Sequence, residues 1–319
     1  MIHRFCVAPM MDRTDRHERY FLRTLSKEMM LYTEMIHANA VIHGNKDNLL
    51  KYHASEHPLG IQLGGSDPCL LSAAATIAEE AGFDEINLNV GCPSSKVQNG
   101  MFGAILMKNP DLVASCVSSI KNKVSIPVTV KCRIGVDEMD EDRDLYNFIN
   151  LVKDSGCETF IIHARKAWLK GLSPKDNREI PPLNYQRVYR LKEQFPDLEI
   201  IINGGIDSVS DSLKHFKYVD GVMMGRAAYD NPFQIGEVDK IIYGKDYRTL
   251  TRNEILKDFM PYIKKEYENG NKLGYITKHL MGLYKGTTKA SLARKIFANI
   301  DKNEEPIDLL TNMYQNLEV

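Results

Sequence analysis

Short strand-like apolar segments recur along this chain, and amphipathic helical segments separate them. One such helix carries Val113, Cys116, Val117 and Ile120 on a single face, at the spacing i, i+3, i+4 and i+7. The predicted strands number eight: Phe5–Pro9, Leu31–Met35, Leu59–Leu63, Glu85–Val90, Val128–Arg133, Thr159–Ala164, Glu199–Asn203 and Gly221–Met224. Eight strands that alternate with helices predict a (β/α)8 TIM barrel of the α/β class.

A doubly wound parallel sheet is the alternative architecture for this alternation. That fold usually carries a glycine-rich GxGxxG turn after its first strand, whereas the first strand here ends in APMMD, which contains no glycine. We therefore favour the barrel and assign it residues 1–243. Residues 244–319 are predicted to form a small helical domain, whose first long helix begins with a capping box of Thr251 and Glu254.

Functional residues of a TIM barrel lie at the carboxyl ends of its strands, and polar or glycine residues occupy most of those ends here. At the fourth strand, Asn87 and Asn89 share one face, and Cys92 follows the strand. A lone cysteine is more often a small buried apolar residue. An amide is costly to bury without a hydrogen-bonding partner, however, so this face indicates a ligand within reach of Cys92.

Two glycine turns follow the last two predicted strands. Asn203, Gly204 and Gly205 end the seventh strand, and Gly225 and Arg226 end the eighth. In TIM barrels these two positions commonly form a phosphate site, because glycine lets an anion approach the backbone N–H groups closely. Two tight structural turns are the simpler interpretation. Together the turns favour a phosphorylated cofactor, whose ring charge a lysine on the fifth strand, Lys131, could balance.

The charge of the predicted helical domain is uneven. Between residues 271 and 302 there are seven basic residues and one acidic residue, a net charge of +6 in a chain of net charge −1. The basic residues are Lys272, Lys278, Lys285, Lys289, Arg294, Lys295 and Lys302. A solvated helix face is the usual explanation of such a run. A surface that binds a nucleic-acid backbone is the more specific one.

Several classes of protein are unlike this sequence. No apolar run approaches the roughly 20 residues that span a membrane, and the N-terminus turns polar too soon for a signal peptide. The six cysteines are scattered without a CxxC pair, which argues against a zinc site or a disulfide framework. We therefore expect a cytoplasmic protein without a metal, and we expect it to be a monomer.

Long motifs in this chain resemble the tRNA-dihydrouridine synthases, most closely their A-type branch. The motifs are APMMDRTDRHERYF at Ala8–Phe21, IQLGGSDP at Ile61–Pro68, LNVGCPSSKVQNGMFGAILM at Leu88–Met107, VKCRIGVD at Val130–Asp137, HARKAWLKGLSPKDNREIPPL at His163–Leu183, INGGI at Ile202–Ile206 and GVMMGRAAYDNP at Gly221–Pro232. They occur in order over nearly the whole chain. The resemblance implies an FMN-binding barrel followed by a helical domain that binds tRNA.

The resemblance also implies a reaction. NADPH reduces FMN, the reduced flavin transfers a hydride to C6 of a tRNA uridine, and an acid protonates C5 to give 5,6-dihydrouridine. The A-type branch acts on the D-loop, at U20 and U20a. By the same resemblance Cys92 is the acid and Asn89 contacts the target uridine. The residues that match the FMN positions of the family are Pro9, Met10, Met11, Gln62, Lys131, His163, Asn203, Gly204, Gly205, Gly225 and Arg226.

Candidate tRNA contacts come from two regions. Arg294 and Lys295 lie where the A-type branch carries a basic motif richer in arginine and tryptophan, so this chain keeps the charge but departs from the pattern. Lys170, Lys175 and Arg178 follow the sixth strand and are further candidates, although a solvated loop explains them almost as well. Two alternative functions remain at this point: an FMN barrel acting on a free pyrimidine, like dihydroorotate dehydrogenase, and a tRNA-binding folding factor without chemistry.

Overall fold

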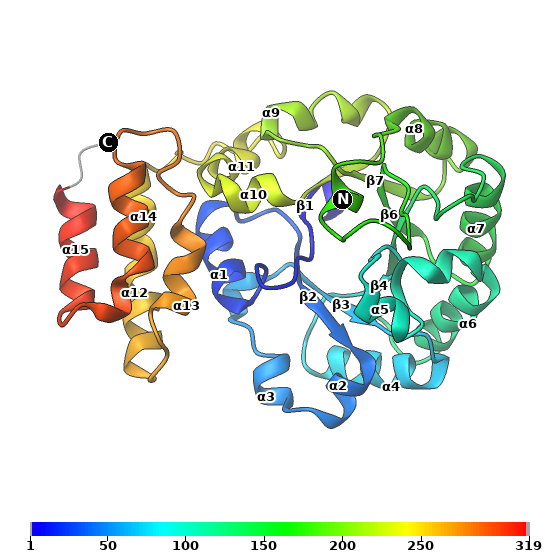
Figure 1. Cartoon of the computed structure of the whole chain (residues 1–319), viewed down its shortest axis with the longest axis horizontal. Helices are drawn as coiled ribbons and strands as arrows, with labels where there is room; N and C mark the ends of the chain where they lie inside the picture. The colour runs from blue at the N-terminus through cyan, green and yellow to red at the C-terminus, as the bar shows by residue number, and fades with distance from the viewer. Residues whose placement is uncertain (1, 317–319) are drawn as a thin grey trace.

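The computed structural model describes residues 2–316, and within them the chain forms one sheet of eight parallel strands (Figure 1). The strands are β1 (Phe5–Val7), β2 (Leu31–His37), β3 (Leu59–Gly64), β4 (Glu85–Asn89), β5 (Val128–Arg133), β6 (Thr159–His163), β7 (Glu199–Asn203) and β8 (Gly221–Met224). From β2 to β8 each strand pairs with the next, and β1 pairs with β8. A parallel bridge between Cys6 and Met30, just before β2, closes the ring. The predicted TIM barrel is therefore confirmed.

Helices connect consecutive strands on the outside of the barrel (Figure 1). The α-helices of the barrel are α1 (Arg16–Leu25), α2 (Ala38–His43), α3 (Lys46–Leu49), α4 (Pro68–Glu80), α5 (Ser95–Asn99), α6 (Pro110–Lys121), α7 (Arg143–Asp154), α8 (Tyr185–Gln194), α9 (Val209–Ser212), α10 (Arg226–Asp230) and α11 (Val238–Ile241). Short 3-10 helices are η1 (Ile2–Arg4), η2 (Ala54–Glu56), η3 (Gly103–Lys108), η4 (Asp176–Arg178), η5 (His215–Lys217) and η6 (Pro232–Glu237). None of the helices in the part of the chain that is described has the length and apolar character that crossing a membrane requires.

Three of the predicted strands have the observed bounds, and the others differ at their carboxyl ends. The strands β1, β4 and β6 end one or two residues earlier than predicted, at Val7, Asn89 and His163. The strands β2 and β3 continue further, to His37 and Gly64. A short apolar segment marks the buried part of a strand, whereas the last paired residue depends on where the neighbouring strand ends.

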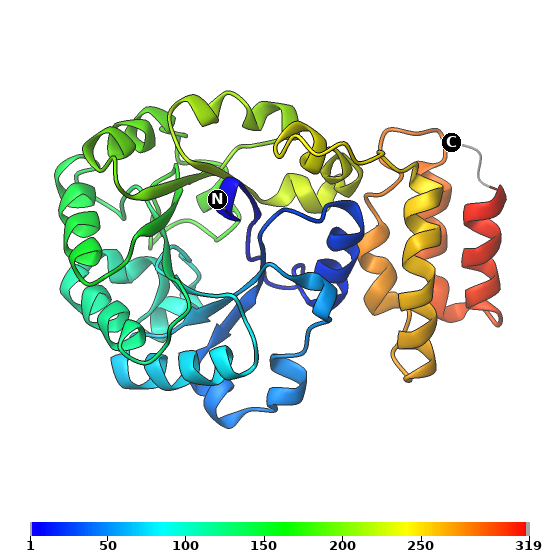
Figure 2. The same ribbon diagram turned by 180° about the vertical axis from the view of Figure 1, so that it is seen from behind.

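A helical region follows the barrel and contains α12 (Arg252–Glu268), α13 (Gly274–Thr277), η7 (Lys278–Leu280), α14 (Ala290–Ala298), η8 (Ile300–Lys302) and α15 (Pro306–Asn316). The capping box predicted at Thr251 and Glu254 is present at the start of α12. Figure 1 and Figure 2 show these helices side by side at one edge of the barrel, beyond α1. We propose the domain boundary between residues 243 and 244. Residue 1 and residues 317–319 of the two predicted domains lie outside the described residues.

The helix α1 joins the two parts of the chain. Asp15 caps α1 and accepts from buried His279 and from Lys278 of the helical region, at 2.9 Å in each ion pair. The next residue, Arg16, pairs with Glu266 of α12. Hydrogen bonds between charged, partly buried groups fix the relative position of two elements more firmly than exposed pairs do. The helical region is therefore attached to the barrel at the loop that leaves β1.

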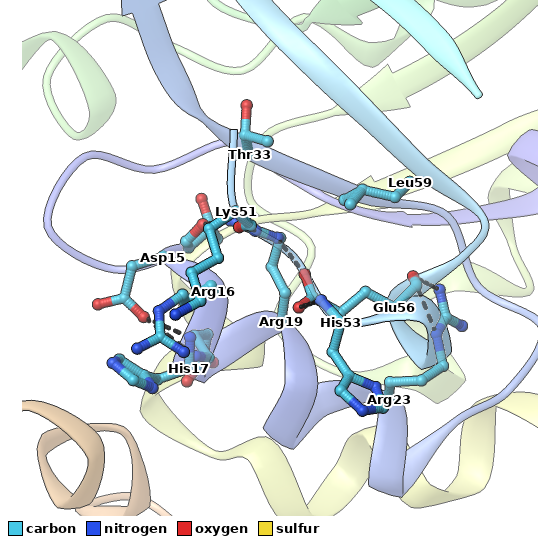
Figure 3. A network of polar contacts seen from close by, with 12 residues as sticks. Asp15, Arg16, His17, Arg19, Arg23, Thr33, Lys51, His53, Glu56 and Leu59 are labelled. Atoms are coloured by element: carbon cyan, nitrogen blue, oxygen red, sulfur yellow. Dashed lines mark hydrogen bonds and ion pairs between the residues drawn. The ribbon is translucent and has the colours of Figure 1, made fainter. Parts of the chain in front are cut away.

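The other side of α1 is fixed to the loop before β3, as Figure 3 shows. The buried Arg19 guanidinium pairs with Glu56 at 2.7 Å and donates to the carbonyl of Thr14 at 3.0 Å. Arg23 donates to the carbonyl of Glu56 from two of its nitrogens. Thr14 in turn accepts from the N–H of Met10 at 3.0 Å. These contacts hold the loop after β1, which carries predicted cofactor residues, in one position.

Candidate active site

Strand register brings the predicted site residues into one row at the carboxyl ends of the strands. Asn89 of β4 is opposite Lys131 of β5, and Arg133 of β5 is opposite His163 of β6. His163 is in turn opposite Asn203 of β7. Because all strands are parallel, their carboxyl ends meet at one rim of the barrel. Residues that are up to 114 positions apart in the sequence, from Asn89 to Asn203, therefore face the same space.

A chain of buried amides supports the loop that carries Cys92. Gln62 donates to Asn87 at 2.7 Å, and Asn89 donates to Gln62 at 2.8 Å. The side-chain oxygen of Asn89 then accepts from the N–H of Gly91 at 3.2 Å and from the N–H of Cys92 at 3.0 Å. The side chain of Cys92 itself is half-buried. Asn89 therefore shapes the Cys92 turn, whatever else it contacts.

The same network continues down the barrel interior. Asn87 donates to Thr129 at 2.8 Å, and Thr129 donates to Glu85. Glu85 also accepts from Tyr32 at 3.0 Å and bonds to His3 below it. Burial alone would lower the pKa of His3, but hydrogen bonds to Glu199 and Glu85 raise it to about 10. A charged imidazole therefore neutralises the carboxylates at the base, and the buried polar groups of this network hold one another in place.

Lys131 is held beside the seventh strand. Its Nζ donates to the side-chain oxygen of Asn203 at 3.0 Å, and Asn203 donates to the carbonyl of Met223 at 2.8 Å. Burial lowers the pKa of Lys131 to about 8, and the positive charge of Arg133 acts in the same direction. An anionic neighbour would stabilise the charged form of such a lysine, because it offsets both the burial and the repulsion from Arg133.

His163 lies next to the glycine turn after β7. Burial, together with the charges of Arg133 and Lys131, holds its pKa well below the ordinary value, so the imidazole is neutral. Its Nδ1 is buried and has no hydrogen-bond partner among the described residues. Gly204 and Gly205 have positive φ angles of 107° and 63°, and a Cβ at Gly204 would lie 3.1 Å from His163 Nε2. An unpaired buried nitrogen beside a turn without side chains is typical of a ligand site.

Arg133 is a positioning residue that sequence reasoning did not select, although it stands at a strand end. Its guanidinium donates to the carbonyls of Gly91 at 2.9 Å, Lys166 at 2.9 Å and Asn177 at 3.0 Å. It thereby joins the Cys92 loop after β4 to the loop after β6. The carbonyls that it binds are far from Arg133 in the sequence, so no local pattern reveals the contacts.

Residues 6–318 match the family described as dihydrouridine synthase. That match covers nearly the entire chain. The chain belongs to the dihydrouridine synthase family. The predicted resemblance is confirmed, and the predicted enzyme class with it, because the family consists of flavin-dependent oxidoreductases.

Relatives in several bacteria match this dihydrouridine synthase family member over most of their length. The tRNA-dihydrouridine(20/20a) synthase of Shewanella oneidensis is 50% identical over 315 residues, which cover 98% of this chain and 94% of the relative. The protein of the same name in Escherichia coli K12 is 53% identical over 309 residues, which cover 96% of this chain and 89% of the relative. A solved 2-naphthoyl-CoA reductase complex superposes with a TM-score of 0.59 at 10% identity, over 76% of this chain and 50% of that chain, which shows the fold alone.

The predicted RNA contacts of this dihydrouridine synthase family member lie in two regions, the loop after β6 and the helix α14. Arg178 is the last residue of η4, in the loop that follows β6, and its side chain is exposed. Lys170 and Lys175 are exposed on the same loop. The helix α14 carries Arg294 and Lys295, both exposed, on the helical region.

A surface hollow connects the barrel rim to the helical region. It is lined by Asp207, Arg226, Ala227, Asp230, Asn231 and Gln234 of the barrel and by Lys285 of the helical region. Arg226 also pairs with Glu179 at 2.6 Å. One basic residue of the 271–302 stretch therefore lies beside the predicted phosphate end of the site.

No cluster of His, Cys, Asp and Glu that could hold a metal ion occurs in residues 2–316.

Proposed function

We propose that this protein uses FMN and NADPH to reduce the D-loop uridines U20 and U20a of tRNA to 5,6-dihydrouridine. The observation that carries the proposal is the row of Asn89, Lys131, His163 and Asn203 beneath the Cys92 loop. The names of the relatives, which share 50–54% of their residues with this chain, support the substrate and the positions.

The residues at the rim fit a flavin with one phosphate. The neutral His163 offers an unpaired nitrogen, and the turn of Gly204 and Gly205, with two positive φ angles, carries no side chain. Lys131 offers a buried ammonium group, and an anionic flavin ring beside it would offset the cost of burying that charge. The residues that would hold FMN are Pro9, Met10, Met11, Gln62, Lys131, His163, Asn203, Gly204, Gly205, Gly225 and Arg226. When bound and reduced by NADPH, FMN would supply the hydride for C6 of uracil.

The side chains of this protein supply the proton and hold the base. The thiol of Cys92 donates the proton to C5, which makes it a general acid. Asn89 positions the Cys92 turn through the N–H groups of Gly91 and Cys92, and it contacts the uracil. The Lys131 ammonium balances negative charge at the cofactor ring, and Asn203 orients that ammonium.

The tRNA contacts in this proposal are Lys170, Lys175 and Arg178 at the rim and Arg294 and Lys295 on α14. A uridine must leave the stacked RNA to enter the barrel rim, so a second basic surface is needed to hold the rest of the tRNA. The protein would do this as a monomer in the cytoplasm.

The function is tested with the purified protein under anaerobic conditions. Heat should release FMN, NADPH should bleach the bound flavin, and a tRNA transcript should restore its colour and gain dihydrouridine at U20 and U20a. Free orotate and uridine are the controls and should not reoxidise the flavin. Reoxidation by a free base would favour the dihydroorotate-like alternative, and no reoxidation by RNA would favour a binding factor. Release of FAD would contradict the assignment of the phosphate site.

Charge reversal of both Arg294 and Lys295 to Glu should weaken tRNA binding and leave NADPH oxidation by the free enzyme unchanged. Each RNA phosphate that the protein no longer neutralises should lower the magnitude of the log–log salt slope by about 0.7–0.9. The matched control reverses Lys121 and Lys123, which are exposed where α6 leads into β5, at the opposite end of the barrel. Binding isotherms at several salt concentrations measure both slopes. Equal slopes for the two double variants would move the RNA site away from α14.

A further inference from the structure

We propose that Tyr185 is a positioning residue that orients the Gly204–Gly205 turn so that peptide N–H groups, and not carbonyl oxygens, meet the cofactor phosphate. This inference rests on the proposed function, because it assumes that a phosphorylated flavin binds at the carboxyl ends of β7 and β8. It adds a residue from α8 to a site whose other predicted residues lie at the strand ends.

The contacts of Tyr185 determine the direction of two peptide groups. Its hydroxyl lies 2.9 Å from the carbonyl oxygen of Gly204 and 3.1 Å from that of Gly205. Both peptide groups are trans. In a trans peptide the N–H points opposite to the C=O. The N–H groups of Gly205 and Ile206 therefore both point away from Tyr185, and two adjacent N–H groups that point the same way form an anion-binding concavity.

The turn needs such a restraint because glycine is conformationally permissive. Gly204 and Gly205 both have positive φ angles, and without side chains their peptide planes can rotate at low cost. A rotated plane would direct a carbonyl oxygen, which carries partial negative charge, at the phosphate. The Tyr185 hydroxyl opposes that rotation, since it can donate to either carbonyl.

Tyr185 is itself fixed in place. It is the first residue of α8, whose cap is Asn184, and its ring packs edge-on against His215 with centroids 4.8 Å apart. A Cβ at Gly205 would lie 2.8 Å from the Tyr185 oxygen, so glycine is required there for the contact to form. The hydroxyl therefore meets the turn from a rigid element.

A second observation places positive charge at the same end of the site. The Nε of Arg165 is buried and has no hydrogen-bond partner among the residues that the structure describes. Arg165 donates to the carbonyls of Glu179 and Pro181. Burial lowers the pKa of Arg165, and the positive charge of Arg226 acts in the same direction. A buried guanidinium nitrogen without a partner, beside a second arginine, is suited to an anion.

The test compares two flavins on the apoprotein. FMN and riboflavin differ only by the phosphate, so Tyr185→Phe should weaken FMN roughly fivefold, as expected for the removal of one hydrogen bond, and change riboflavin affinity little. Quenching of flavin fluorescence measures both affinities. The matched control is Tyr189→Phe, one turn along α8, whose hydroxyl bonds to His215 at 2.7 Å. It should leave the ratio of the two affinities unchanged.

A second readout does not depend on affinity. The phosphorus NMR signal of bound FMN should move in Tyr185→Phe and stay in place in Tyr189→Phe. An unchanged FMN-to-riboflavin ratio with an unchanged signal would overturn the role of Tyr185, and so would an equal loss for both flavins. Wild-type protein that binds FMN no more tightly than riboflavin would instead overturn the proposed phosphate site, and the inference with it.

Discussion

Replacement of Cys92 by alanine should slow the reoxidation of the reduced enzyme by tRNA by two or more orders of magnitude, within the roughly 10²–10⁴ that a general acid contributes. Rapid-mixing absorbance of the flavin measures this step. The loss should be confined to the uridine half-reaction, because in the proposed function the thiol supplies the C5 proton and takes no part in the reaction with NADPH. FMN should therefore stay bound, and NADPH should bleach it at a near-normal rate.

Cys92→Ala should remove the thiol without disturbing the turn that carries it. The Cys92 turn is held by backbone groups: its N–H donates to Asn89, and its carbonyl accepts from Ala104 at 2.9 Å. Alanine keeps both hydrogen bonds. Cys69→Ala, at an exposed cysteine of α4, is the control and should retain full activity. Loss of flavin from Cys92→Ala would indicate a packing role, and undiminished dihydrouridine formation would assign the proton to His163 or to water.

Replacement of Arg133 by methionine should lower the free energy of unfolding by about 2–5 kcal/mol and abolish most tRNA-dependent turnover. Arg133 is only 4% exposed, and three backbone carbonyls would be left without their donor. These carbonyls belong to the loops after β4 and β6, which frame the proposed uracil site, so the Cys92 turn would no longer have a fixed position. Urea unfolding measures stability, and the tRNA half-reaction measures function.

The control for Arg133→Met is Arg143→Met, at an exposed arginine on α7 that pairs with its neighbour Asp144. Exposed pairs of this kind contribute little, so stability and turnover should be close to those of the wild type. The Arg133 variant should also shift the pKa of Lys131 upward from about 8, because one of the two causes that lower it is removed. Stable, fully active Arg133→Met protein would show that the loops hold their positions without the guanidinium.

The fold was accessible from the sequence because its signals are local. Each strand is recognised as a short apolar segment between helical segments, and α12 by the capping box of Thr251 and Glu254 at its start, which the structure contains. The barrel rule then assigns every strand end to one rim. That rule places Lys131, His163 and Asn203 together before any coordinates are known.

The partners of those residues were not accessible in the same way. Tyr185 and Gly204 are 19 positions apart, and Arg133 and Asn177 are 44 apart. Nothing in the neighbourhood of Tyr185 distinguishes a hydroxyl that restrains a turn from one that faces solvent. Likewise Asn89 matched the family's uridine position, yet its hydrogen bond to Gln62, 27 positions away, forms only between neighbouring strands.

The sequence by itself therefore determined the strand count, the rim that carries the site, the glycine turns and the family of this protein. Strand periodicity, caps and glycine positions depend on neighbours within a few residues, so a linear pattern records them. Tertiary structure alone decided which groups pair: Asp15 with His279 across the two parts of the chain, Arg19 with Glu56 under α1, and Tyr185 with the Gly204–Gly205 turn. Such pairs depend on the closure of the barrel, because only closure brings residues that are distant in the chain within hydrogen-bonding distance.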